Sequence, residues 1–424
     1  MVYAEELEKT LAQATNFYWV AWNKKPSMQD AFSQAFSTIY PPKISAFDKS
    51  CYEGMKILLS LCGSKFSEKY IRNLLPAFYN IIDPTTDLSK QQISDMLHSI
   101  YQKFLDWKDV MTVYFPVECI RVDGDAEISF GNVKFLSFNA LLQKKHGEFF
   151  DKYLAEQPKN LKPSSVAAFA MMADIQKTRD TGKQIVNEIL NVIQFVNPLS
   201  IVHDQAPHFV LSEQYPYRHA VTFRMLQNTI DIDSMYRTGS VQELHFPLKG
   251  DALKKWKESL GDNAVAIMQS CDNGDLSDIL KQAIYWHATG ERENSSERAF
   301  IYYTMALESI FTPTGNRVSM QTVMAESVAL ILGTSTENRL AIKKKVKKLY
   351  LLRSQIAHGK MNYVGNCDLE TQRYFSYSTI KFIFSKKTEF NNQKDITNYI
   401  ENLKFTLPDD IESTHVTETR GNDV

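Results

Sequence analysis

The feature that most constrains the fold is a long C-terminal stretch that contains no strand signal. Over residues 277–405, apolar side chains recur at helical spacing. Breaks fall at residues 312–315, at Gly333-Thr334 and at His358-Gly359, where Gly and Pro favour turns. About four or five helices are therefore expected, and because short connections place consecutive helices side by side, they should pack as an all-α bundle.

The first part of the chain combines helical and strand patterns. Helical spacing predominates from residue 3 to about 110, with breaks at Pro41-Pro42 and Asp83-Pro84. Over residues 111–138, the segments TVYFPVECIRV and AEISFGNVKFLSF are rich in β-branched and aromatic residues, and the turn signal Asp123-Gly124-Asp125 separates them. This pattern predicts a β-hairpin.

The predicted fold class is an α+β N-terminal region, mostly helical with a β-hairpin or small sheet, followed by the all-α bundle. Helical periodicity returns at residues 164–195, strands are expected near HFVLSE and HAVTFRML, and DALKKWKESLG predicts a short connecting helix. We expect an N-terminal region over residues 1–270, divisible into subdomains of about 1–160 and 161–270, and a helical domain over 277–405. Residues 406–424 carry almost no large apolar side chains, which predicts a disordered tail.

Composition limits the cellular setting more than the function. Lys and Arg number 48 against 49 Asp and Glu, so the net charge of -1 gives no sign of a nucleic-acid or membrane partner for the chain as a whole. The five cysteines are widely spaced and form no Cys-x-x-Cys pair, as is typical of a reducing compartment. The N-terminus lacks the pattern of a secretory signal, and no run of about 18 apolar residues occurs. We expect a cytoplasmic protein without a membrane partner.

The densest chemistry lies in KKKVKKLYLLRSQIAHGKMNY, residues 343–363. Arg353 and His358 are five residues apart, which places them roughly 140° from each other on an ideal helix. Gly359 favours a helix end, so we expect His358 in the last turn or cap, where the chain can bend and the long Arg353 side chain can reach it. The negative end of the helix dipole favours the imidazolium there, and the guanidinium can hold two phosphate oxygens. An Arg and a His at this spacing more commonly form a surface charge and a cap.

The neighbouring residues allow two interpretations each. The lysines could steer RNA towards the pair, although a solvated helix face is the commoner meaning of such a run. Tyr350 and Tyr363 could stack an unpaired base or belong to the core. Glu308 could pair with Arg353 and orient it, or lie exposed on its helix. The lysine run comprises Lys343, Lys344, Lys345, Lys347 and Lys348.

Two segments resemble motifs of the HEPN superfamily, and within it of the ApeA-like branch. LYLLRSQIAHG is similar to the family's motif of Arg, a polar residue, three or four variable residues and His, with Ser354 as the polar residue. Many family motifs have Asn where Ser354 stands. AFIYYTMALESIF resembles the family's apolar helix with a Leu-Glu pair, here Leu307 and Glu308. The resemblance covers residues 277–405.

The resemblance implies a metal-independent endoribonuclease with Arg353 and His358 as catalytic residues and Ser354 and Glu308 in support. In such a reaction the ribose 2′-hydroxyl attacks the adjacent phosphorus, His acts as general base or acid, and Arg stabilises the phosphate. It also implies a homodimer around one RNA cleft, cleavage of tRNA or other single-stranded RNA, and a toxin or effector role in bacterial anti-phage defence by abortive infection, with no cofactor. The architecture alone leads us to expect that residues 1–270 sense a trigger, for which a phage component is the candidate, or restrain the C-terminal nuclease. The alternative is a non-catalytic HEPN scaffold that dimerises or binds RNA.

Other polar groups indicate no further chemistry. His203, Asp204 and His208 in VHDQAPH have the spacing of no standard metal site, so no metal is expected. Asp123 and Asp125 are typical turn residues. The chain lacks a Gly-x-x-x-x-Gly-Lys loop, a Gly-x-Gly-x-x-Gly fingerprint and a Gly-x-Ser-x-Gly elbow. Nucleotide hydrolysis, dinucleotide redox chemistry and serine hydrolysis therefore lack support.

Overall fold

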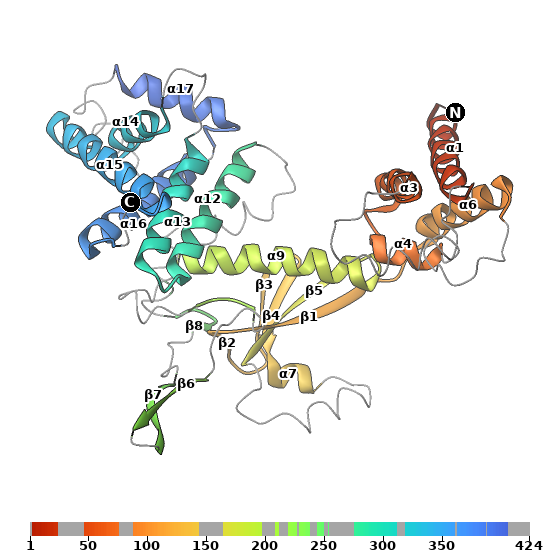
Figure 1. Cartoon of the computed structure of the whole chain (residues 1–424), viewed down its shortest axis with the longest axis horizontal. Coiled ribbons are helices and arrows are strands. Elements are labelled where there is room, and N and C mark those ends of the chain that lie inside the picture. Colours follow the sequence, from red (N-terminus) through yellow and green to blue (C-terminus); the bar gives the residue numbers. More distant parts are fainter. Residues whose placement is uncertain are drawn as a thin grey trace, which may run out of the picture. The chain divides into compact units, whose positions relative to one another are not determined.

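The computed structural model divides into two compact units (Figure 1). The first comprises Met1–Tyr114 and Phe169–Gln184, and the second comprises Phe115–Ala168 and Ile185–Val424. The domain boundaries expected from the sequence stay predictions. The structure describes residues 2–23, 46–75, 88–143, 164–196, 208–211, 219–226, 229–237, 244–249, 253, 275–311, 319–360, 363–386 and 388–405.

The described residues of the first 114 positions, which belong to the first unit, form four helices, as the helical spacing of this region predicts. Their buried faces carry Leu11, Tyr18, Leu58 and Ile93, which share one apolar core. Hydroxyl caps start two of them, including a capping box in which Ser89 and Gln92 satisfy each other's backbone amides. The expected proline breaks lie outside the described residues. The helices are α1 (Val2–Asn23), α3 (Ala46–Cys62), α4 (Glu68–Leu74) and α6 (Lys90–Asp106).

A small four-stranded sheet follows, with the order β1-β5-β4-β3. Beside it, β2 pairs with β8 in parallel, and β6 pairs with β7 as an antiparallel hairpin. Two helices belong to this part of the chain, the short α7 (Phe138–Leu142) and the long α9 (Ile175–Phe195). The strands are β1 (Met111–Val117), β2 (Ile120–Val122), β3 (Glu127–Phe130), β4 (Val133–Ser137), β5 (Ser165–Met171), β6 (His219–Leu226), β7 (Thr229–Arg237) and β8 (Leu244–Phe246).

The predicted hairpin between the segments on either side of Asp123-Gly124-Asp125 is wrong in its pairing. The first segment splits into β1 and β2, which pair with β5 and β8, and the hairpin forms within the second segment as β3–β4. Its two-residue loop starts at Gly131, whose φ of 60° suits the first loop position of a tight hairpin turn. Gly124 also has positive φ, but its turn connects strands of different sheets.

The helix predicted over residues 164–195 is wrong in its first third. The segment SVAAFAM is the strand β5, and α9 begins only at Ile175. Alanine gives this segment a helical composition, but its position between β1 and β4 provides backbone partners on both edges, which outweighs local propensity. HAVTFRML forms β6 as expected, whereas the described part of HFVLSE, residues 208–211, forms an isolated bridge from Leu211 to Val117 instead of a strand. The expected helix DALKKWKESLG lies outside the described residues except for Leu253.

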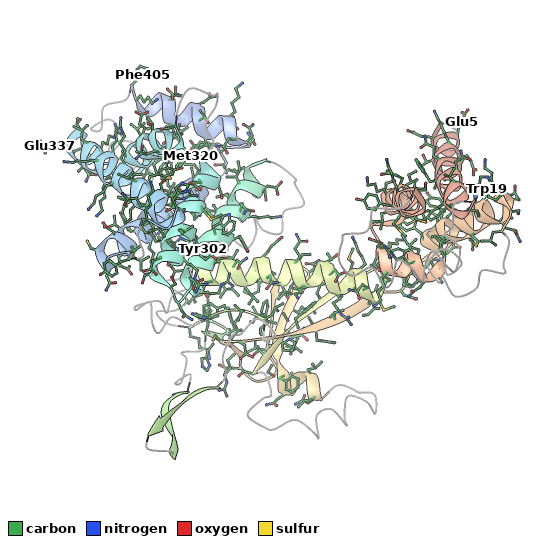
Figure 2. All side chains as sticks on the ribbon, in the orientation of Figure 1. Glu5, Trp19, Tyr302, Met320, Glu337 and Phe405 are labelled. Atoms are coloured by element: carbon green, nitrogen blue, oxygen red, sulfur yellow. The ribbon has the colours of Figure 1, made fainter. Side chains whose placement is uncertain are left out.

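The C-terminal region is helical throughout its described residues, as predicted, but it has six helices where four or five were expected. Two further helix starts account for the difference, because Ser295 caps α13 after a break that follows Arg292, and Asn392 caps a separate last helix. Side chains fill the space between the helices (Figure 2). The large side chains of Phe300, Tyr303 and Leu349 are among those that are fully buried. The helices are α12 (Asp275–Arg292), α13 (Ser296–Ile310), α14 (Met320–Leu332), α15 (Thr336–Ala357), α16 (Asn366–Ser385) and α17 (Gln393–Leu403).

Close packing of α12 against α13 yields a stability prediction. A Cβ atom on Gly290 would lie 2.6 Å from the ring of Tyr303, which is fully buried and has no room to move. We expect Gly290→Ala to lower the free energy of unfolding by about 1–3 kcal/mol, even though alanine alone favours the helix by about 1 kcal/mol. Denaturant unfolding measures this. The matched change Gly365→Ala, with no atom within 4 Å, should cost less than about 1 kcal/mol, and equal losses would contradict the packing argument.

Candidate functional site

The helix α15 carries most of the predicted site residues, and its N-terminus has ordinary helix signals. Ser335 caps it by accepting a hydrogen bond from the Asn338 amide, and Glu337 in the first turn, labelled in Figure 2, complements the helix dipole. Val346 and Leu349 form its buried stripe. This narrow stripe leaves much of the helix surface available for charged residues.

The C-terminal end of α15 forms at Gly359, as the sequence predicts. Gly359 has a φ of 67°, its amide donates to the Ile356 carbonyl at 3.0 Å, and the Lys360 amide donates to the Gln355 carbonyl at 2.8 Å. These two bonds define a Schellman motif. His358 is the C-cap residue and its side chain is exposed, so an imidazole accessible to solvent stands at the negative end of the helix dipole.

Arg353 points towards α13, where its Nη2 lies 3.2 Å from a carboxylate oxygen of Glu308. Both side chains are largely buried, with 27% and 20% of their surface exposed. The Tyr350 ring lies beneath the guanidinium, 6.0 Å from Cζ to the ring centroid. Burial and the hydrogen bond to Glu308 raise the pKa of Tyr350. Of the two interpretations of Glu308, the structure therefore shows the ion pair that orients Arg353.

Arg353 is paired with Glu308 and is not bonded to His358 in the described part of one copy of the chain. Among the described residues, no hydrogen bond or ion pair joins the side chains of Arg353 and His358. Their spacing explains this, because five residues rotate the helix by about 140° and Glu308 holds Arg353 on the bundle side. Ser354 is half-buried and its carbonyl accepts the His358 amide at 3.1 Å. The expected reach of Arg353 to His358 stays a prediction.

The lysine run separates into two groups. Lys343 contacts Glu326 at 2.7 Å and Lys345 contacts Asp368 at 2.6 Å, so both hold α15 against other helices. The other members of the run are exposed, namely Lys344, Lys347 and Lys348. Tyr363, the second aromatic residue near the motif, is 68% exposed, unlike a core residue.

Sequence reasoning missed a buried polar network on α12, α13 and α16. Arg373 donates two hydrogen bonds to the Glu291 carboxylate, at 2.5 and 2.7 Å, and the Tyr303 hydroxyl donates a third at 3.0 Å. His287 lies 3.5 Å from the same carboxylate through Nε2 and 2.9 Å from the Ser376 hydroxyl through Nδ1. The His287 and Glu291 spacing of four is visible in the sequence, but nothing there connects it to Arg373.

This network is structural rather than catalytic. A serine, a histidine and a glutamate lie together as in a hydrolase triad, namely Ser376, His287 and Glu291. However, Ser376 is fully buried, and the Glu291 carboxylate is already paired with Arg373. Burial lowers the pKa of His287 to about 4, against the opposing effect of Glu291. Burial alone would raise the pKa of Glu291, but the hydrogen bonds from Arg373 outweigh it and the pKa is lowered. The network thus holds neutral histidine and ionised glutamate.

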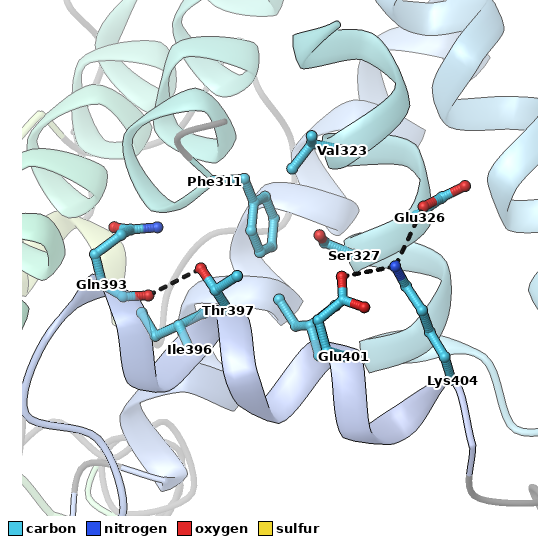
Figure 3. A pocket seen from close by; sticks show the side chains of 10 residues that line it. Phe311, Val323, Glu326, Ser327, Gln393, Ile396, Thr397, Glu401 and Lys404 are labelled. Carbon is cyan, nitrogen blue, oxygen red and sulfur yellow. Dashed lines mark hydrogen bonds and ion pairs between the residues drawn. The ribbon is translucent and has the colours of Figure 1, made fainter. Parts of the chain in front are cut away.

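A small cleft of about 160 Å³ lies between α14 and α17 (Figure 3). Lys404 crosses one end of it and contacts Glu326 at 3.8 Å and Glu401 at 2.7 Å. None of the predicted catalytic or RNA-binding residues lines the cleft. It is lined by Phe311, Val323, Glu326, Ser327, Gln393, Ile396, Thr397, Ile400, Glu401 and Lys404.

The buried His287 predicts sensitivity to acid. Because its pKa falls from 6.5 to about 4 on folding, the unfolded chain binds an additional proton between these pH values. Its contribution to stability is present above pH 6.5 and is lost as the pH falls to about 4, by up to about 3 kcal/mol. Unfolding measured at a series of pH values should show this loss. His287→Gln should flatten the dependence, and a wild-type protein equally stable at pH 7 and pH 5 would refute the assignment.

The left-handed backbone of Gly359 makes a second prediction. Gly359→Ala should destabilise the chain by about 1–2 kcal/mol, because a Cβ is strained at this φ although no atom lies within 4 Å. Gly359→Asn should lose less, because asparagine tolerates the left-handed region. Hydrogen exchange of the Lys360 amide reports the motif directly. Unchanged protection of that amide in Gly359→Ala would contradict the proposed helix end.

Comparisons with known proteins return no relative. No family model matches the chain, and neither a curated protein nor a solved structure matches it. Among the described residues, no group of three or more His, Cys, Asp and Glu side chains is arranged to hold a metal ion. None of the described helices combines the length and apolar character needed to cross a membrane.

Proposed function

We propose that residues 277–405 form an ApeA-like HEPN module and that this module is a metal-independent RNA endonuclease. The observation that carries the proposal is the arrangement at the end of α15. Glu308 fixes Arg353 in a largely buried position, and five residues later the exposed His358 caps the same helix. A fixed cation and a solvent-accessible imidazole at a helix end are the groups that cleavage by the ribose 2′-hydroxyl requires.

Each residue has a distinct role in the proposed reaction. His358 removes the proton from the 2′-hydroxyl or supplies one to the leaving 5′-oxygen. The 2′-oxygen forms a bond to phosphorus as the bond to the 5′-oxygen breaks, which leaves a 2′,3′-cyclic phosphate. Arg353 stabilises the crowded phosphate, since one contact to Glu308 leaves other N–H donors of its five for phosphate oxygens. Tyr350 and Glu308 orient it.

Dimerisation would allow Arg353 of one copy and His358 of the other to act on the same RNA. Within one copy they are about 140° apart on α15, so a single copy presents them on different faces. A homodimer with both motifs at one cleft would bring Arg353 of each copy towards RNA held at the His358 of its partner. The tRNA or other single-stranded RNA substrate follows from the 2′-hydroxyl requirement and from the family resemblance.

The remainder of the chain is proposed to restrain the nuclease until a phage-derived trigger arrives, as an effector of bacterial defence would require. Contacts through the half-buried Arg292 support a restraining connection, because its guanidinium donates to the Phe209 carbonyl at 3.2 Å and to the side chain of Asn191 on α9. These contacts tie the start of the bundle to the preceding part of the same unit. Toxicity of the full-length protein in cells without any trigger would contradict this role.

A non-catalytic scaffold is the second candidate function. The neutralisation of Arg353 by Glu308 favours this alternative, because an ion pair of this kind also stabilises a helix interface. Such a protein would dimerise or bind RNA through the same helices without cutting it.

The test is cleavage of total RNA and purified tRNA in EDTA. Wild-type protein should cleave, and Arg353→Ala and His358→Ala should each lower the rate by at least about 100-fold, since each removes a group that contributes roughly this factor. Arg298→Ala and His245→Ala are matched controls at exposed positions and should retain full activity.

The outcomes separate the two candidate functions. Cleavage that survives EDTA and disappears only in the two site variants supports the nuclease. RNA binding without cleavage by wild-type protein supports the scaffold, and loss of activity in EDTA with wild-type rates in both variants rejects the proposed site.

A further inference from the structure

We propose that the exposed face of α15 is a binding track for the phosphates of single-stranded RNA, formed by Lys344, Lys347 and Lys348 and ending at His358. The nature of the ligand rests on the proposed function, but the track itself follows from the helix geometry and the ion pairs. Lys345, which the sequence also suggests for RNA binding, is excluded from it.

The four residues share one side of the helix. At 3.6 residues per turn, Lys344, Lys347, Lys348 and His358 fall within about 100° of arc. Leu351, which is 55% exposed, lies on the same arc between the lysines and the histidine and offers an apolar surface to a ribose or base. Arg353 lies about 120° from Lys347 in the opposite sense. The track therefore leads to the imidazole and not to the guanidinium.

The ion pairs distinguish these lysines from their neighbours. Lys343 and Lys345 are engaged with Glu326 and Asp368, whereas no ion pair involves Lys344, Lys347 or Lys348 among the described residues. Three exposed ammonium groups on one helix face attract a polyanion, because bound phosphates release their counterions.

The acidic side chains nearest the track do not compensate its charge. Glu326 is paired with Lys343 and is also influenced by Lys404 and Lys347, and these lysines lower its pKa. Asp368 on α16 is paired with Lys345. These two carboxylates are thus paired with Lys343 and Lys345, which lie outside the track. Within the helix, the exposed Glu337 lies two turns before Lys344, so three lysines stand against one acidic residue on this side of α15.

The length of the track suits a strand of several nucleotides. From Lys347 to His358 the helix rises about 16 Å at 1.5 Å per residue. A stacked strand places a phosphate about every 3.4 Å, so about five phosphates fit between the lysines and the catalytic end. A flexible single strand can follow this straight line along the helix.

The test measures binding apart from cleavage. The full-length protein is titrated into a fluorescent 2′-O-methyl RNA strand, which cannot undergo 2′-hydroxyl attack, at about 50 to 200 mM salt. The triple variant Lys344→Gln, Lys347→Gln, Lys348→Gln should bind at least about tenfold more weakly at the lowest salt, and the slope of log affinity against log salt should fall by about 2, at 0.7 per lost contact. All three side chains are exposed, so the variant should fold.

A control variant removes the same charge elsewhere. Lys9→Gln, Lys69→Gln, Lys90→Gln changes three exposed lysines of the first unit and should leave both affinity and slope unchanged. Equal weakening in both triple variants would overturn the track, as would failure of the wild-type protein to bind the RNA strand. Lysine-dependent binding to anionic phospholipid vesicles in the absence of RNA binding would also overturn it.

Together with the cleavage assay, this experiment distinguishes failure of the RNA-binding track from failure of the endonuclease proposal. Lysine-dependent binding by a protein that never cleaves natural RNA would retain the track and reject the endonuclease. Cleavage by a protein whose RNA binding does not depend on the three lysines would reject the track and retain the endonuclease.

Discussion

The buried carboxylate of Glu291 is the interaction on which the helical region depends. Arg373 and Tyr303 donate hydrogen bonds to it and His287 lies beside it, so one side chain connects α12, α13 and α16. A buried charge is tolerated only when it is paired and hydrogen-bonded in this way, and removing one partner leaves an uncompensated charge that costs several kcal/mol, on the order of 3–5. The requirement fixes the relative positions of the three helices.

The positions of these helices determine the geometry of the candidate site. α13 carries both Tyr303 of the network and Glu308, which orients Arg353, and α16 carries both Arg373 and the Asp368 that holds Lys345. Two of the ion pairs that position α15 thus come from helices that the network has already placed. What these pairs leave unengaged on α15 is the exposed lysine face and the histidine at its end, which is where a polyanion can bind.

Local sequence patterns correctly predicted local features, but they failed where contacts with distant segments determine the structure. Gly359 indicated the end of α15 because a left-handed residue is needed there, and the pairing of Glu308 with Arg353 was one of two stated interpretations. The strand β5 was missed because its alanine-rich sequence favours a helix, and only β1 and β4 on either side make it a strand. Asp368, which pairs with Lys345, and Ser376, which is bonded to His287, both lie on α16, so no spacing rule could identify them.

The central claim is that the end of α15 directs attack by a ribose 2′-hydroxyl. The most direct measurement places a single 2′-deoxynucleotide at a mapped cleavage position of an otherwise natural RNA and identifies the product ends by mass spectrometry. If the 2′-hydroxyl is the nucleophile, we expect 2′,3′-cyclic phosphate ends on the natural strand and no cleavage at the substituted position. Cleavage at the 2′-deoxynucleotide, or products that carry a 5′-phosphate, would contradict it.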